Sequence, residues 1–400
     1  MIVQHFLKWI DHAPVAQRVL AAYALARAYM HSTMEFDERC AAEAALTLLL
    51  DDPSPKVRAA LADAFSSSAA APLHIVAALA CESVSISGPI LTCSPLLLDM
   101  DLVDRVATGD LAMQKAIAQR SAISTVLSAA FAEIAEPEAC IDLLYNRGAR
   151  IASVSYRRLV ERLGHLPDVR EALLDDESLP SDCRHELAVC VGEALAHSDL
   201  VTAMLGSRRV ECIVRDACIK ASLMLVDRTD QSEYPALIEH LLLRGDLTTA
   251  FVIRVTAFGK LEFLAAILAS LSGQTVHRVN ALLDSGRDTA LFALFRGAGL
   301  PESVHQTLLV AVFAWRKVGS AKLMVGPQEI ARMMMNSIPP EAADGGHRSA
   351  NDDLITLLRG IYLETIRENA RNHALDVAAT PASNPSKGIL LEASAVAAAA

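Results

Sequence analysis

Clustered arginines are the feature of this 400-residue chain most able to do chemistry. Residues 145–170 contain six arginines and only two acidic residues. The planar guanidinium group forms paired hydrogen bonds with carboxylate and phosphate groups. The candidate binding residues are Arg147, Arg150, Arg157, Arg158 and Arg162. The pattern predicts a surface for an acidic or phosphorylated segment of a protein partner.

The spacing within this segment predicts how the arginines are presented. Arg158 and Arg162 are four residues apart, so we expect them on one exposed helix face, with no acidic residue at i, i+4 in that helix. Glu161 is expected to pair with Arg157. The alternative is a solvated helix face whose charge is balanced by acidic turns of neighbouring helices.

Other residues that carry chemistry are dispersed. The eight cysteines include no C-x-x-C pair and no zinc-finger spacing with histidine. Cys183 and Cys190 lie on an apolar helical stripe, so we expect them to be small core residues in a reducing compartment. His185 and Glu186 begin a zincin-like pattern, but Val189 stands where the second histidine belongs. The sequence has no G-x-S-x-G, P-loop or dinucleotide-binding motif. We therefore expect no enzymatic activity, cofactor or metal, while an active site assembled from distant helices remains an alternative.

Composition limits the remaining classes. Apolar residues make up 52% of the chain, aromatic residues only 4%, and the net charge is −11. The abundant alanine and leucine favour packed helices over strands. The acidic total opposes binding to nucleic acid or to anionic membranes. Charges interrupt every apolar run well short of about 20 residues, so we expect no membrane span.

Regularly spaced glycines indicate the architecture of the C-terminal half. Glycines occur at positions 245, 259, 273, 286 and 299. Glycine adopts the left-handed conformation just past a helix end most easily. The regular spacing predicts three-turn helices, each closed by a glycine.

A second pattern lies near the N-terminus, in residues 46–66. A helix ending in LTLLL is followed by the turn DDPSP, and a second helix begins with Ser54 as N-cap and Pro55 at its first position. Apolar residues then recur at helical spacing, which predicts a buried stripe. The stripe consists of Val57, Ala60, Leu61, Ala64 and Phe65.

The segment DDPSPKVR with its alanine-rich second helix resembles a HEAT repeat. In that family, an Asp and an Arg link adjacent repeats, and the resemblance gives these roles to Asp52 and Arg58. The interval from Pro55 to Pro137 is about two units of the roughly 40-residue HEAT period.

Residues 235–310 carry a further resemblance. LIEHLLLRGDLTTAFVIRVTAFGKLEFLAAILASLSG, a V-x-x-L-L-x-x-G turn and LFALFRGAGLPES resemble an uncharacterised, mainly alphaproteobacterial family of helical proteins, and the similarity is expected to reach back through 40–310. The resemblance implies an all-helical bacterial protein. It assigns no catalytic or binding residue.

The sequence therefore predicts an all-α fold, a HEAT-like solenoid of stacked antiparallel helix pairs. The expected parts are HEAT-like repeats in 1–230, a glycine-capped array of short helices in 231–337, a flexible loop in 338–350, a helix in 351–375 and a disordered tail in 376–400. We expect a non-enzymatic cytoplasmic scaffold or adaptor for a protein partner. A nucleic-acid-binding HEAT-like protein is the alternative, which a continuous basic groove would favour.

Overall fold

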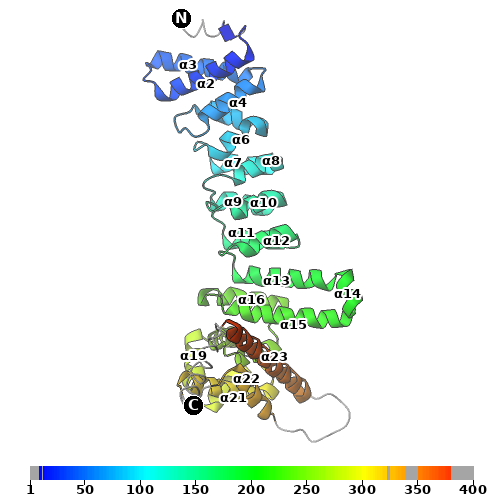
Figure 1. Cartoon of the computed structure of the whole chain (residues 1–400). Coiled ribbons are helices and arrows are strands. Elements are labelled where there is room, and N and C mark those ends of the chain that lie inside the picture. The colour runs from blue at the N-terminus through cyan, green and yellow to red at the C-terminus, as the bar shows by residue number, and fades with distance from the viewer. Residues whose placement is uncertain (1–8, 11, 322–324, 339–349, 380–400) are drawn as a thin grey trace, which may run out of the picture. The chain divides into compact units, whose positions relative to one another are not determined.

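The described part of the chain is entirely helical. The computed structural model describes residues 9–10, 12–321, 325–338 and 350–379. These residues form 22 α-helices, α2 to α23, two short 3-10 helices and no β-strand (Figure 1). An isolated parallel bridge joins Ile123 to Ala149. The expected all-α fold is confirmed.

The chain divides into two compact units, 1–218 and 219–400. Unit 1 contains α2 (Val15–His31), α3 (Phe36–Leu48), α4 (Pro55–Phe65), α5 (Leu73–Ala80), α6 (Val84–Cys93), α7 (Asp99–Thr108), α8 (Leu111–Ala118), α9 (Thr125–Ile134), α10 (Pro137–Tyr145), α11 (Ser153–Leu163), α12 (Pro167–Asp175), α13 (Ser181–Ala196) and α14 (Asp199–Leu205). The division falls inside α15 (Ser207–Val226). Unit 2 continues with α16 (Tyr234–Arg244), α17 (Thr249–Ala257), α18 (Leu261–Ser272), α19 (Val276–Ser285), α20 (Asp288–Gly297), α21 (Glu302–Gly319), α22 (Pro327–Asn336) and α23 (Ala350–Ala379).

Alternate helices contact one another in unit 1. One series runs from α4 through α6, α8 and α10 to α12, and the other from α7 through α9 and α11 to α13. Figure 1 shows these helices following one another from blue to green. In the first series, α6 begins at Val84, α8 at Leu111, α10 at Pro137 and α12 at Pro167. One helix pair therefore takes up about 27 residues, which is at the short end for helical repeats.

This spacing corrects the period inferred from the prolines. Pro55 begins α4 and Pro137 begins α10, and α6 and α8 lie between them in the same series. The interval between the two prolines therefore covers three steps of about 27 residues rather than two of about 40. Loops of only a few residues between short helices account for the shorter step.

Four of the five residues in the predicted stripe of α4 are buried, and Ala64 is partly buried. Val57, Leu61 and Phe65 are fully inaccessible to solvent and belong to the hydrophobic core of unit 1. Ser54 and Pro55 occupy the predicted N-cap and first helical positions, although the Ser54 side chain makes no cap hydrogen bond. Instead, the Ser54 N–H donates to Asp52 Oδ1 at 2.8 Å, which tightens the turn that enters α4.

Four of the five predicted glycine caps adopt the left-handed conformation. These are Gly245, Gly259, Gly273 and Gly299, with φ between 67° and 75°. Gly286 is the exception, because its φ of −62° and ψ of 148° are extended. The chain leaves α19 in this extended conformation and enters α20 at Asp288.

The structure places two of the predicted boundaries at different residues. The predicted boundary after residue 230 lies beyond the division between 218 and 219. The predicted loop at 338–350 and tail at 376–400 fall mostly outside the described residues. The C-terminal helix α23 ends at Ala379, so 376–379 are helical rather than part of a disordered tail.

Candidate functional site

Arg147 and Arg150 lie in the segment between α10 and α11, whose backbone is held in place. The Ile123 N–H donates to the Gly148 carbonyl at 3.1 Å, and the Arg150 N–H donates to the Ile123 carbonyl at 3.0 Å. The Asn146 side-chain amide also donates to two carbonyls at the end of α8. Both arginine side chains are exposed, and neither has an ion-pair or hydrogen-bond partner within the described ranges. A fixed backbone therefore presents two available guanidinium groups.

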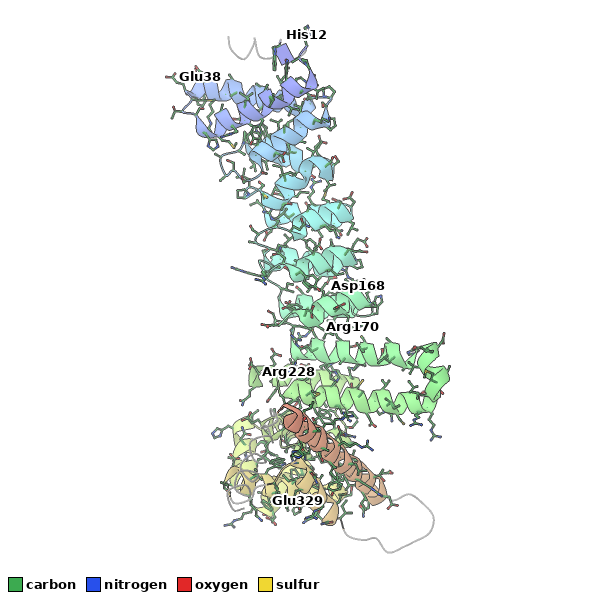
Figure 2. All side chains as sticks on the ribbon, in the orientation of Figure 1. His12, Glu38, Asp168, Arg170, Arg228 and Glu329 are labelled. Carbon is green, nitrogen blue, oxygen red and sulfur yellow. The ribbon has the colours of Figure 1, made fainter. Side chains whose placement is uncertain are left out.

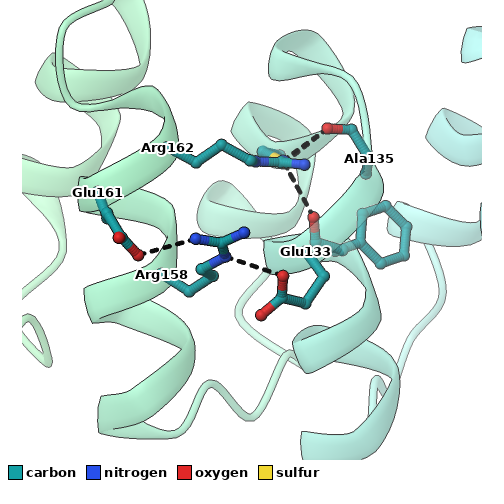
Figure 3. Close-up of polar contacts among 7 residues, drawn as sticks. Glu133, Ala135, Arg158, Glu161 and Arg162 are labelled. Atoms are coloured by element: carbon teal, nitrogen blue, oxygen red, sulfur yellow. Dashed lines mark hydrogen bonds and ion pairs between the residues drawn. The ribbon is translucent and has the colours of Figure 1, made fainter.

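Arg158 lies between two carboxylates, as Figure 3 shows. Its Nε donates to Glu133 Oε2 on α9 at 2.8 Å, and its Nη1 donates to Glu161 Oε2 at 2.8 Å. These hydrogen bonds, first to Glu161 and then to Glu133, raise the pKa of Arg158 above its ordinary value. The expected pairing of Glu161 with Arg157 is therefore wrong, because Glu161 contacts Arg158 at i, i+3.

Arg162 is not on an exposed face, which corrects a second expectation. It is half-buried, and its Nη2 donates to the Ala135 carbonyl at 2.7 Å and to the Phe131 carbonyl at 3.3 Å (Figure 3). These carbonyls lie at the C-terminal end of α9, where a positive charge is favourable. Arg162 therefore links α11 to α9.

The Sγ of Cys140 lies in the same cluster, 3.5 Å from Arg162 Nη2. Burial raises the pKa of this thiol to about 11, although the nearby Arg162 lowers it in part. Cys140 is therefore a neutral core thiol that contacts the Phe131 and Ala135 carbonyls. The sequence offered no signal for this contact.

Arg157 and Arg170 also have partners inside unit 1. Arg157 Nε donates to Asp182 Oδ2 at 2.6 Å, and the Asp182 side chain is buried in the first turn of α13. Arg170 on α12, labelled in Figure 2 beside Asp168, donates to the Gly164 carbonyl at 3.2 Å. Of the five candidate arginines, only Arg147 and Arg150 therefore remain available.

Arginine-to-carbonyl links recur elsewhere. Arg120 donates to the carbonyls of Leu91 and Ser94 at the end of α6. In unit 2, Arg316 donates to the carbonyls of Leu282, Leu283 and Gly286 at the end of α19. Arg162 belongs with these structural residues, because each arginine donates to carbonyls at the C-terminal end of another helix, and some of these carbonyls also accept a backbone N–H.

A family model described as "Uncharacterised protein conserved in bacteria (DUF2336)" matches residues 86–348. The chain belongs to this family. The expectation of an uncharacterised bacterial helical family is confirmed, and the matched range begins and ends later than the expected 40–310. No curated protein and no solved structure matches the chain. All five candidate arginines lie within the DUF2336 region.

The HEAT-like turn precedes the DUF2336 region. Arg18 on α2 donates to Asp52 with Nε–Oδ2 and Nη2–Oδ1 distances of 2.8 and 3.0 Å. Arg58 donates to the Asp52 carbonyl, and its Nε lies 3.0 Å from Glu82 Oε1 without hydrogen-bond alignment. Asp52 thus connects α2 with the turn before α4, and Arg58 connects α4 with the loop between α5 and α6.

The charge of Asp52 is stabilised by these contacts. Burial alone would raise its pKa, but the Arg18 hydrogen bonds and the Ser54 N–H outweigh burial and lower the pKa below its ordinary value. The carboxylate therefore stays ionised at neutral pH and serves to join α2 to the turn before α4.

The sequence reasoning missed a row of exposed apolar residues in the DUF2336 region. Met100, Val126 and Val154 are the second residues of α7, α9 and α11, and their exposed fractions are 79%, 61% and 72%. These three helices begin about 27 residues apart. Aligning the sequence at their starts would have placed the three apolar residues at the same helix position. Val154 is four residues after Arg150, so an exposed apolar residue and an exposed cationic residue lie near each other in sequence at the start of α11.

In the residues that the structure describes, no three His, Cys, Asp or Glu side chains gather in a way that could hold a metal ion. None of the described helices is by itself both long and apolar enough to cross a bilayer, and only the bent pair α13 and α14 meets these criteria when combined.

Proposed function

We propose that the chain is a cytoplasmic, non-enzymatic scaffold that binds a protein partner through unit 1. We further propose that unit 1 is a HEAT-like solenoid of antiparallel helix pairs, since alternate helices contact one another at a nearly regular step along the chain. In such arrays, residues at equivalent helix positions form extended binding surfaces. All eight cysteines are free thiols, which suits a reducing compartment.

The observation that carries the proposal is the availability of Arg147 and Arg150. Their guanidinium groups are exposed while the three neighbouring candidates contact Asp182, Glu133, or the carbonyls of α9. Because the backbone of 146–150 is hydrogen-bonded to the preceding loop, little ordering is needed on binding.

The residues near Arg147 and Arg150 indicate the chemistry of the proposed partner. The exposed apolar residues at the starts of α7, α9 and α11 supply contact area, and the two arginines supply an anchor for carboxylate or phosphate. We therefore propose an acidic or phosphorylated protein segment as the ligand, bound along this end of the helices. Exposed ion pairs are screened over about 10 Å at 0.1 M salt, so binding should weaken as salt rises.

The test is affinity capture from the source bacterium with the double variant Arg147→Glu/Arg150→Glu. Proteins recovered by the wild type should be lost, because like-charge contact at an interface costs several kcal/mol, on the order of a hundred-fold in affinity. The matched control is Arg27→Glu/Lys56→Glu, which makes the same charge change at two other exposed unit 1 residues. Equal recovery by both double variants would remove the arginines from the proposed site.

A further inference from the structure

The long C-terminal helix α23 lies outside the region that defines the family. The family match ends at residue 348, and α23 begins at Ala350. Within unit 2, α23 packs mainly against α22 and also against α17 and α21, three helices inside the matched region (Figure 1). The family's own helices thus form a face that an appended helix covers.

The contact of α23 with this face is concentrated in the first half of the helix, where Leu357 and Tyr362 are also partly buried against the core. Its buried side chains are Leu354, Leu358, Ile361 and Thr365, which recur at i, i+4, i+7 and i+11 along a single stripe. From residue 367 to residue 375, every side chain is exposed. In that half of α23, Asn369 contacts α22 through a hydrogen bond of 3.2 Å to Gln328. Only the first half of α23 is therefore buried against unit 2.

The carboxylate of Glu364, beside the buried stripe, forms ion pairs with two cations of unit 2. Glu364 Oε1 lies 2.9 Å from Lys220 Nζ, and Glu364 Oε2 lies 3.3 Å from Arg254 Nη1. Arg254 is almost completely buried on α17, so the face carries a cation that favours an acidic group on any helix bound there. The face thus recognises apolar residues at three positions and a carboxylate at a fourth.

We propose that this face of α17, α21 and α22 is a docking site for a helix of a protein partner, and that α23 occupies it as a built-in competitor. The partner helix carries apolar residues at i, i+4 and i+7 and a carboxylate at i+10, which are the positions of Leu354, Leu358, Ile361 and Glu364 in α23. An amphipathic helix in an apolar groove is a common mode of recognition. Covalent attachment makes α23 a strong competitor, so the site opens only to a tighter ligand or after α23 is weakened.

The probe is a fluorescent synthetic peptide of residues 350–375, added to the full-length chain. The wild type should bind it weakly, because its own α23 holds the site. Leu358→Asp places a charge at a fully buried position of α23 and should increase peptide affinity at least ten-fold. The matched control is Ile355→Asp, which makes a similar change at a position 40% exposed and should behave as the wild type.

Two further measurements test the ion pairs of Glu364 and the opening of α23 in the wild type. A peptide carrying Glu364→Lys should bind the Leu358→Asp chain at least ten-fold more weakly than the wild-type peptide, since it opposes Arg254 and Lys220. In the wild type, backbone amides of α23 should exchange with solvent at least ten-fold faster than those of residues 263–269 in α18, which are all buried.

The proposal is overturned if α23 exchanges only when all of unit 2 unfolds, or if Leu358→Asp melts unit 2 without gaining peptide affinity. Either result would make α23 a permanent part of the core. A wild-type dimer formed by reciprocal exchange of α23, detected by light scattering, would also overturn it by making a second copy the occupant.

Discussion

At the scale of single residues, the partner of an arginine determines its role. Arg147 and Arg162 are identical in type and lie in one basic segment, yet one is exposed and the other contacts carbonyls at the end of α9. Removing an arginine that donates to such carbonyls takes away their charged hydrogen-bond donor. The two residues should therefore respond differently to truncation.

We expect Arg162→Ala to destabilise unit 1 by about 1.5–3 kcal/mol, the usual contribution of hydrogen bonds made by a charged group. Arg147→Ala should change the free energy of unfolding by no more than about 0.5 kcal/mol. Denaturant unfolding of both variants measures the difference. Equal midpoints would show that the Arg162 contacts with Ala135 and Phe131 contribute nothing.

Cys140 provides a chemical test of the same cluster. Because burial raises its thiol pKa to about 11, only about one thiol in a thousand is ionised at pH 8, and the thiolate is the reactive form. A thiol reagent at pH 8 should modify exposed Cys93 readily and Cys140 only after unfolding, as peptide mass spectrometry can show. Rapid modification of Cys140 in the folded chain would contradict the described packing.

The sequence could predict only part of this site. It identified the basic segment and placed three arginines on one helix, because those relationships are local. It could not identify Glu133 or the Ala135 carbonyl as partners, since they lie 25 and 27 residues away on another helix. Nor could it predict Cys140 beside Arg162, because that contact depends on how α9, α10 and α11 pack.

At the scale of elements, the glycine pattern shows what local sequence can and cannot predict. A glycine permits a left-handed residue without requiring one. Gly245 and Gly259 both adopt φ of 75°, whereas Gly286 is extended. A glycine after a helix therefore does not by itself determine the backbone conformation.

The two glycines with the same φ differ in their surroundings, which gives a matched pair of substitutions. A Cβ at Gly245 would meet open space, so Gly245→Ala should cost about 1–2 kcal/mol for the left-handed backbone alone. A Cβ at Gly259 would lie 2.7 Å from the Trp315 ring, so Gly259→Ala should cost about 1–3 kcal/mol more. Thermal or denaturant unfolding can compare them. Equal losses would mean that the Trp315 ring moves aside freely.

At the scale of the whole molecule, composition predicted the fold class, whereas the repeat length required the structure. Abundant Ala and Leu and regular apolar stripes favoured helices throughout. Pro55 and Pro137 alone could not distinguish two long steps from three short ones, because α6 and α8 lie between them without a matching proline at their start. The division within α15 was also hidden, since a continuous helix carries no break in its periodicity.

The contacts between alternate helices in unit 1 lead to the last prediction, which tests the proposed solenoid. Leu61 on α4 is fully buried, so Leu61→Ala should cost about 2–5 kcal/mol. In a repeat array, each helix is stabilised by its neighbours, so the loss of stability should be confined to α4 and the helices that contact it. Hydrogen exchange should accelerate in α4 and α6 and stay nearly unchanged in α10 and α12. Leu173→Ala, at a fully buried position of α12, is the control and should give the opposite pattern. Equal acceleration across unit 1 in both variants would instead indicate a single cooperative core, in which the helix contacts extend their stabilising effect well beyond nearest neighbours.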